Sequence, residues 1–370
     1  MVDNLKILIL NDYRTATGGA DRMALAMADE LTALGHNTIF WAPQDVVGLS
    51  YSKSPRFIMQ NFFNFRIFYT LRKLIQNEAP EIIVVHSWTK QLSISCIWAT
   101  QNIPTYIVTH DYFLTCPNGG QFNYSTRMLC PLNGGSFQCL TTNCDKNNYR
   151  TKLYRTVRFY LQSWILQHIK PNVVCLNRTQ MKMFAKHKLN CQYVPNSLRY
   201  LTGVVQGSCG DEILYVGRPD PEKGLDRVLD ASIGSKLKFS IVGPDHDTSG
   251  LAGPNVTFLG WKSGPEIEEQ FHKARLLVFP SRWLEVDPLV PLEACANGVP
   301  VYCSSDNVFA DTLNAYGLGD FIFKTDTDLK KNLNAMYERS GDPKLRKKFR
   351  ELFDSENKLR EGFITHEVTY

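Results

Sequence analysis

The sequence predicts an α/β protein made of two doubly wound domains. Its 370 residues are too many for one ordinary core and suit two domains of roughly 150 to 200 residues each. Hydrophobic residues make up 44% of the chain and charged residues 21%, so a sizeable core can form and the disordered and fibrous classes are excluded. Apolar runs alternate with helical patterns in two separate series, which is the rhythm of parallel sheets joined by helices.

The first series opens the chain. An apolar run at residues 5–10 precedes a helical pattern at residues 21–34, which Gly35 closes. The strands expected in this series are residues 5–10, 38–42, 81–85 and 104–108.

The second series starts after a glycine-rich stretch, residues 201–210, which suits a junction between domains. Its expected strands are residues 213–216, 237–242, 256–259, 276–279 and 300–303, and its expected helices are residues 225–233, 265–274 and 291–297. We therefore expect a first domain at residues 1–203, a second at 204–345 and a helical tail at 346–370, within an amphipathic pattern that covers residues 342–367.

Charge is unevenly distributed. Residues 1–200 hold 21 Lys and Arg against 10 Asp and Glu, a net charge of +11, and the rest of the chain carries −6. Residues 46–77 and 146–210 contain no acidic residue and mix basic with aromatic side chains. Because zinc-finger, basic-zipper and RNP-like strings are missing, we expect an anionic membrane or a phosphorylated lipid as partner and no nucleic acid.

The expected compartment is the cytoplasm. No run approaches the roughly 20 apolar residues that span a bilayer, and the first apolar run is too short for the core of a signal peptide. The ten cysteines are then expected to be reduced.

Ligands of open parallel sheets bind beyond the carboxyl ends of the strands, so residues just after each strand are the candidates for chemistry. Gly18 and Gly19 follow the first strand and precede the first helix. Glycines let the backbone approach an anion closely, and a helix N-terminus presents free N–H groups. A simple tight turn explains the pair equally well.

Arg218 and Lys223 follow the first strand of the second domain, on a loop that ends at Gly224. Two cations on one loop suit a diphosphate, which arginine can grip as a fork and lysine as a point charge. The alternative is a polar turn whose cations are solvated.

Glu285 and Glu293 lie in the densest string of the chain, with seven residues between them. Glu285 ends a loop after an apolar run, and Glu293 is expected in the first turn of a short helix that Gly298 terminates. Both carboxylates can accept hydrogen bonds from sugar or ribose hydroxyls. A glutamate favoured by the helix dipole and an unrelated loop acid would give the same pattern.

His110 stands at the end of an apolar run in the first domain, and Asp111 could fix the orientation of its ring. His86 ends the preceding run in the same way. A histidine at a strand end can contact a sugar hydroxyl, but it can also be purely structural.

Taken in order, these strings resemble the family-four class of retaining glycosyltransferases, over nearly the whole chain. The resemblance rests on the glycine pair, the strand-end His110, the Pro195-Asn196 string, the Gly217-Arg218 and Glu222-Lys223-Gly224 strings, the Pro280-Ser281 string and the two glutamates. It implies a GT-B fold, with two Rossmann-like domains that face each other across a cleft and a C-terminal helix that packs back on the first domain.

The resemblance also implies roles for single residues. Arg218 and Lys223, with Gly19, would hold the donor diphosphate, Glu293 the ribose, and Glu285 the transferred sugar. His110 would contact that sugar from the first domain, and Gly18 and Gly19 would lie near the phosphates and the acceptor. Base contacts would come from Gly260-Trp261-Lys262. Two departures from the family pattern, Pro288 and Asn196-Ser197, remove no charged group that the chemistry needs.

A cysteine-rich insertion is expected at residues 112–148, as in one subgroup of the family. Cys116, Cys130, Cys139 and Cys144 could hold a structural zinc ion, although the spacing lacks a CxxC pair and free thiols are an equal alternative. The chemistry of the family needs no divalent metal, because the loop cations neutralise the leaving diphosphate.

Two segments suit the interface of an anionic membrane or, equally, a core: residues 150–170 and residues 55–75, both rich in aromatic and basic side chains. The acid-free stretches favour the membrane, and polyisoprenyl diphosphate carriers would be natural acceptors. We therefore predict a retaining hexosyltransferase of bacterial surface-polysaccharide type, at the inner face of the cytoplasmic membrane. A catalytically silent docking protein is the alternative, and a dehydrogenase is excluded because no GxGxxG string follows the first strand.

Overall fold

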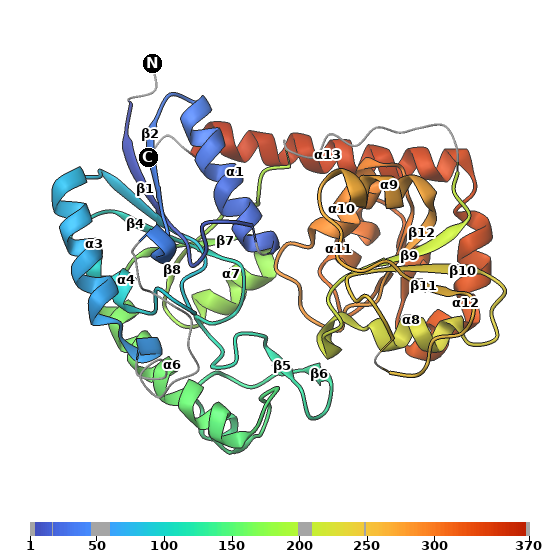
Figure 1. The fold of residues 1–370 in the computed structure, drawn as a ribbon, viewed down its shortest axis with the longest axis horizontal. Helices are drawn as coiled ribbons and strands as arrows, with labels where there is room; N and C mark the ends of the chain where they lie inside the picture. The colour runs from blue at the N-terminus through green and yellow to red at the C-terminus, as the bar shows by residue number, and fades with distance from the viewer. Residues whose placement is uncertain (1–3, 17, 46–59, 199–208, 248, 368–370) are drawn as a thin grey trace. The chain divides into compact units, whose positions relative to one another are not determined.

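The computed structural model describes residues 4–16, 18–45, 60–198, 209–247 and 249–367, the last six by backbone alone (Figure 1). The chain divides into two compact units. The first comprises Met1–Gly120, Pro131–Ser197 and Gly362–Tyr370, and the second comprises Gln121–Cys130 and Leu198–Glu361.

The first unit is built on a parallel six-stranded sheet in the order β2-β1-β3-β4-β7-β8. Its strands are β1 (Lys6–Leu10), β2 (Asn37–Trp41), β3 (Ile82–Val85), β4 (Thr105–Thr109), β7 (Asn172–Cys175) and β8 (Asn190–Tyr193). Strands β1 and β3 are apolar apart from Lys6, as expected for strands covered on both faces, and β4 has an apolar centre between two threonines.

Helices connect these strands as crossovers. They are α1 (Gly19–Ala33), α3 (Phe65–Glu78), α4 (Ser95–Ala99), α6 (Tyr149–Ile169) and α7 (Arg178–Ala185). Figure 1 shows α1 on one side of the sheet and α3 and α4 on the other. The side chains of Asn64, Asn148 and Asn177 accept backbone N–H groups and so cap α3, α6 and α7.

The second unit repeats the design, with strand order β11-β10-β9-β12-β13-β14, all parallel. Its strands are β9 (Glu212–Val216), β10 (Lys238–Val242), β11 (Val256–Phe258), β12 (Ala274–Phe279), β13 (Val301–Ser304) and β14 (Ile322–Phe323). Because β9 and β12 are neighbours, the loops that follow them adjoin.

The elements around this sheet are η2 (Pro221–Lys223), α8 (Leu225–Ser232), α9 (Pro265–Lys273), α10 (Leu289–Ala296), α11 (Phe309–Ala315), η3 (Gly319–Phe321), α12 (Asp326–Arg339) and α13 (Pro343–Glu367). The predicted tail is thus one long helix, α13. Its apolar residues Phe349, Leu352 and Phe353 are buried in the core of the second unit, so this part of the tail belongs to that domain.

Every strand predicted from the sequence is present, within two residues at each end. Strands β7, β8 and β14 and helices α7, α11 and α12 were not predicted. Within the expected insertion at residues 112–148, the hairpin of β5 (Phe122–Asn123) and β6 (Met128–Leu129) groups with the second unit, where Arg127 Nη1 lies 3.2 Å from Asp226 Oδ2. The predicted junction falls mostly outside the described residues. Within the described ranges, no helix has the length and apolarity to cross a bilayer.

Candidate functional site

The loop between β9 and α8 is held tightly against the loop that follows β12. Gly224 has a φ of +73°, and a Cβ at this position would lie 2.4 Å from the carbonyl oxygen of Pro280. No other residue type fits this conformation and this approach. The glycine therefore brings Lys223 next to the Pro280–Pro288 segment.

Lys223 and Glu285 are in direct contact. Lys223 Nζ lies 2.6 Å from Glu285 Oε1, and both side chains are largely buried. Ser281 Oγ donates to the same carboxylate oxygen at 2.9 Å, and the ammonium of Lys223 lies over the ring of Trp283, 4.9 Å from its centroid. Two strings that are far apart in the sequence thus form one polar cluster at the carboxyl ends of β9 and β12.

Arg218 lies on the same loop but is open to solvent. Its side chain is 57% exposed, and Nη1 lies 3.2 Å from Asp220 Oδ2. The loop below it is fixed, because Tyr215 donates its hydroxyl to the carbonyl of Arg218 at 3.0 Å. A partly exposed guanidinium on an ordered loop can reach an anion without a change of backbone.

Glu293 is placed differently from its prediction. Helix α10 begins at Leu289 after Pro288, so Glu293 is the fifth helical residue and the first turn carries no acid. The helix-dipole explanation therefore fails for this residue. Glu293 is buried in the second unit, a position that a carboxylate tolerates only with polar partners. Gly298 follows the C-cap with a φ of +65°, as expected.

Two further arginines, Arg227 and Arg282, which no sequence motif marked, hold the loops of this cluster together. Arg227 is buried and donates from Nη1 to the Pro280 carbonyl and to Ser304 Oγ, each at 3.0 Å. Arg282 donates to Asp226 Oδ1 at 2.7 Å. Both tie the segment after β12 to α8, so Glu285 is carried by a braced loop. Only contacts over large sequence separations reveal this role.

Gly18 is the N-cap of α1 and has extended backbone angles that any residue can adopt. A Cβ at this position would meet nothing within 4 Å. The fold itself therefore does not require a glycine here.

His110 follows β4 and pairs with His86, which follows the neighbouring strand β3. His86 Nδ1 lies 3.0 Å from His110 Nε2, and the rings stack with their centroids 5.3 Å apart. Asp111, expected to orient His110, instead accepts the backbone N–H of Phe113 at 3.0 Å. The expected orienting contact is thus made by His86, because adjacent strands end side by side.

Asp12, which no sequence motif marked, organises the same edge of the sheet. Its buried carboxylate accepts the backbone N–H groups of Lys90, Gln91 and Leu92 at 2.8–2.9 Å. Arg158 Nη1 donates to the Thr89 carbonyl of the same loop at 3.2 Å. The loop after His86 is therefore fixed from two sides.

For the four cysteines of the insertion, a structural zinc ion and free thiols are the two alternatives that the sequence leaves open. Within the part of the chain that the structure describes, no group of three or more His, Cys, Asp or Glu residues is arranged to hold a metal ion. The sulfur of Cys139 instead accepts from the buried Lys152 Nζ at 3.1 Å, and Cys116 donates to Asn118 Oδ1 at 3.0 Å. Neighbouring side chains thus contact the thiols of Cys139 and Cys116.

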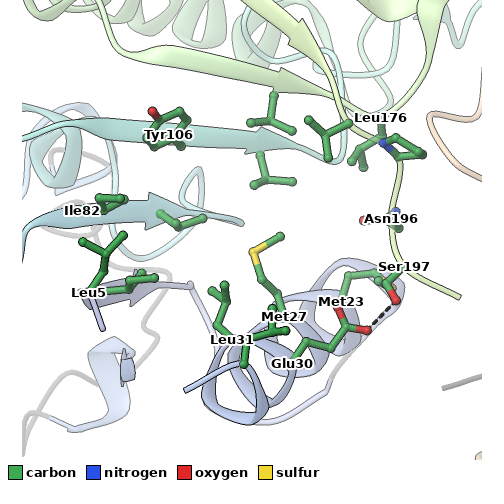
Figure 2. A pocket seen from close by; sticks show the side chains of 17 residues that line it. Leu5, Met23, Met27, Glu30, Leu31, Ile82, Tyr106, Leu176, Asn196 and Ser197 are labelled. Carbon is green, nitrogen blue, oxygen red and sulfur yellow. Dashed lines mark hydrogen bonds between the residues drawn. The ribbon is translucent and has the colours of Figure 1, made fainter. Parts of the chain in front are cut away.

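An apolar hollow separates α1 from the face of the first sheet (Figure 2). Its lining comes from α1, β1, β3, β4 and β7 and from residues 194–197. The polar contact drawn there joins Ser197 Oγ to Glu30 of α1, and Met27 projects from α1 into the hollow. The Pro195-Asn196 string therefore lies on the edge of this hollow.

Helix α6 covers residues 149–169, as predicted, but its apolar residues do not form one buried face. Leu153, Val157, Tyr160 and Trp164 are 38–59% exposed and follow each other at spacings of three or four, while Phe159 and Ile165 are buried. On α3, Phe65 and Tyr69 are also exposed. The second predicted segment, residues 55–75, lies partly outside the described residues. We call the four exposed residues of α6, Leu153, Val157, Tyr160 and Trp164, the exposed stripe.

Solved structures share this architecture. A sucrose-phosphate synthase from Thermosynechococcus elongatus matches with a TM-score of 0.71 and 16% identity, over 98% of this chain and 99% of that one. HepE from Anabaena, solved in complex with UDP-glucose, matches with a TM-score of 0.66 and 12% identity, over 99% and 100% of the two chains. Two parallel-sheet Rossmann-like units with these matches define the GT-B glycosyltransferase fold.

Family models identify the chain further. Residues 17–175 match Glycosyltransferase Family 4, and residues 210–352 match Glycosyl transferases group 1. The protein belongs to this family of glycosyltransferases. Over 98 residues it is 38% identical to an uncharacterized 41.2 kDa protein in the cps region of Klebsiella pneumoniae, and the match spans 25% of this chain and 27% of that protein.

Proposed function

We propose that the protein is a retaining glycosyltransferase that moves a hexose from a nucleotide-diphosphate sugar to a glycan or to a polyisoprenyl-diphosphate-linked acceptor. The contact between Lys223 and Glu285 carries this proposal, because it sets a cation suited to a leaving diphosphate beside a buried carboxylate suited to sugar hydroxyls. The complex of HepE with UDP-glucose supports a nucleotide sugar as donor.

Each predicted site residue takes one role in this proposal. Arg218 and Lys223, with the backbone at Gly18 and Gly19, neutralise and hold the diphosphate. Glu293 accepts hydrogen bonds from the ribose, and Glu285 orients the transferred sugar. His110 accepts a hydrogen bond from one hydroxyl group of that sugar. Since protein cations balance the leaving charge, turnover should persist in the presence of a chelator.

The test is release of nucleotide diphosphate from a panel of UDP-, GDP- and ADP-sugars, with and without a polyisoprenyl diphosphate acceptor. Lys223→Ala and Glu285→Ala should each lower turnover by about a hundredfold or more, because each removes a preorganised group at the reacting centre. Lys238→Ala and Glu269→Ala, at exposed ion pairs of the same unit, are matched controls. Silence with every donor, together with no donor binding by calorimetry, would favour the docking alternative.

We also propose that the protein acts at an anionic membrane, in the synthesis of a surface polysaccharide. The exposed stripe on α6 supports the membrane, because solvent-facing aromatic and aliphatic residues on a helix without acidic residues suit a lipid interface. The relative in a cps region supports the pathway.

Sedimentation with vesicles tests the membrane proposal. Wild-type protein should bind phosphatidylglycerol vesicles, bind less as salt rises, and ignore phosphatidylcholine vesicles. The double variant Val157→Glu, Trp164→Glu should lose binding while it stays folded. Asn334→Glu, Ala335→Glu adds the same number of charges to exposed positions of α12 in the second unit and should retain most binding. Equal binding of the double variant and the wild type would place the contact elsewhere.

A further inference from the structure

We propose that Met27 and His86 are positioning residues that hold His110 as the Nε2–H tautomer and keep its Nδ1 as a hydrogen-bond acceptor for the transferred sugar. The sugar as ligand of His110 rests on the proposed function; the tautomer itself does not. The three side chains come from α1, the end of β3 and the end of β4.

The ring of His86 lies between the other two side chains. Its Nε2 is 3.3 Å from Met27 Sδ, and its Nδ1 is 3.0 Å from His110 Nε2. The residue is only 2% exposed, so each ring nitrogen must find its partner within the protein. Figure 2 shows the Met27 side chain as it leaves α1 toward the strands.

The thioether sets the direction of the first hydrogen bond. A methionine sulfur has lone pairs and no proton, so it can only accept. The short contact at 3.3 Å is attractive if His86 Nε2 carries a proton and repulsive if two lone pairs face each other. His86 Nε2 is therefore the donor to Met27.

Burial then decides the second nitrogen. Burial, reinforced by repulsion from His110 whenever that ring is protonated, holds the pKa of His86 well below its usual value of 6.5, so the ring is neutral and carries one proton. With that proton on Nε2, His86 Nδ1 is an acceptor. The bond at 3.0 Å to His110 must be donated by His110 Nε2–H.

This direction has a consequence for the chemistry of His110. In the neutral ring, Nδ1 then bears the lone pair and accepts a hydrogen bond from a hydroxyl group. Nδ1 can also take a proton without loss of the contact to His86, because Nε2 remains the donor in both states. His110 lines a small cavity together with Ser87, Thr89 and Asp111, and our proposal places the hydroxyl group of the sugar there.

The experiment is long-range proton–nitrogen correlation NMR on the full chain with ¹⁵N-labelled histidine rings at pH 7, with assignment by His86→Asn and His110→Asn. We expect Nε2–H tautomers for both rings. Met27→Leu keeps the shape but removes the acceptor, so His86 should populate both tautomers and kcat should fall by about tenfold or more, with less change in KM.

The matched control is Met23→Leu, one turn earlier on α1 and in the same hollow, which should keep both tautomers and full turnover. An Nδ1–H or charged His86 in the wild type would overturn the proposal, as would unchanged tautomers in Met27→Leu. If no donor is turned over, the proposed function fails while the spectra still decide the tautomer.

Discussion

The environment of Asp111 disfavours the ionised form of its carboxyl group. It follows β4 at the edge where His110 lies, and burial raises its pKa from 3.8 to about 6, although the Phe113 amide and the charge of Arg158 act in the opposite direction. Asp12 adds to the increase and Lys90 opposes it. A carboxyl in this setting costs stability when it ionises and can exchange a proton near neutral pH.

The free energy of unfolding should depend on pH because of the Asp111 carboxyl group. Since the folded pKa lies above the unfolded value, the native state binds more protons between about pH 4 and 6, and this contribution to stability falls as pH rises through that window. Asp111→Asn, which keeps the acceptor for Phe113, should therefore gain more unfolding free energy relative to wild type at pH 7 than at pH 4. Urea unfolding at both pH values measures this; an equal difference at both would contradict it.

Among the elements, the short turn η2 connects the loop of Arg218 and Lys223 to the loop that carries Glu285. Its end at Gly224 combines a positive φ with backbone contact to Pro280, and Arg227 and Arg282 brace the same junction. The stability of this junction and the geometry of the donor site should therefore change together.

Two glycine substitutions separate the need for a positive φ from the need for space beside Pro280. Gly234→Ala places a Cβ in open space at a φ of +77°, so it should cost only the left-handed strain, about 1–2 kcal/mol. Gly224→Ala adds overlap with Pro280 and should cost roughly 2–3 kcal/mol more. Chemical unfolding gives both values, and calorimetry with nucleotide should show weaker binding for Gly224→Ala alone. Similar losses in both variants would mean that the loops separate without strain.

Considered as a whole, the molecule has two units with separate hydrophobic cores, and Arg218, Lys223 and Glu293, which we propose as the diphosphate and ribose residues, lie in the second. A nucleoside diphosphate without a sugar should make most of its contacts with that unit, and in the first unit only with the backbone at Gly18 and Gly19. At 100 times its Kd it should stabilise the second unit by about 2.7 kcal/mol.

Hydrogen exchange with mass spectrometry tests this division. The nucleotide should protect residues 212–224 and 280–296 and leave β1 of the first unit unchanged. Equal protection of both units would contradict this division of the contacts.

Much of the fold follows from local patterns. The run at residues 5–10 and the rhythm after residue 213 predict strands because a buried parallel strand must be apolar along its length. Gly35 and Gly298 mark helix ends because a left-handed residue is required there. Arg218, Lys223, Glu285 and His110 are recognisable because ligands gather at strand ends.

Local sequence patterns could not predict which of these side chains contact each other. Lys223 and Glu285 are 62 residues apart and meet because β9 and β12 are neighbours; His86 replaces Asp111 as the partner of His110 because β3 and β4 are neighbours. The cysteine spacing left a metal and free thiols as equal alternatives, and only the packing shows that Cys139 contacts Lys152. The apolar side chains of α6 could be assigned to core or surface only after its neighbours were known. Residue type and periodicity thus specify elements and candidate chemistry, whereas strand order and burial, which depend on contacts distant in sequence, specify which groups act together.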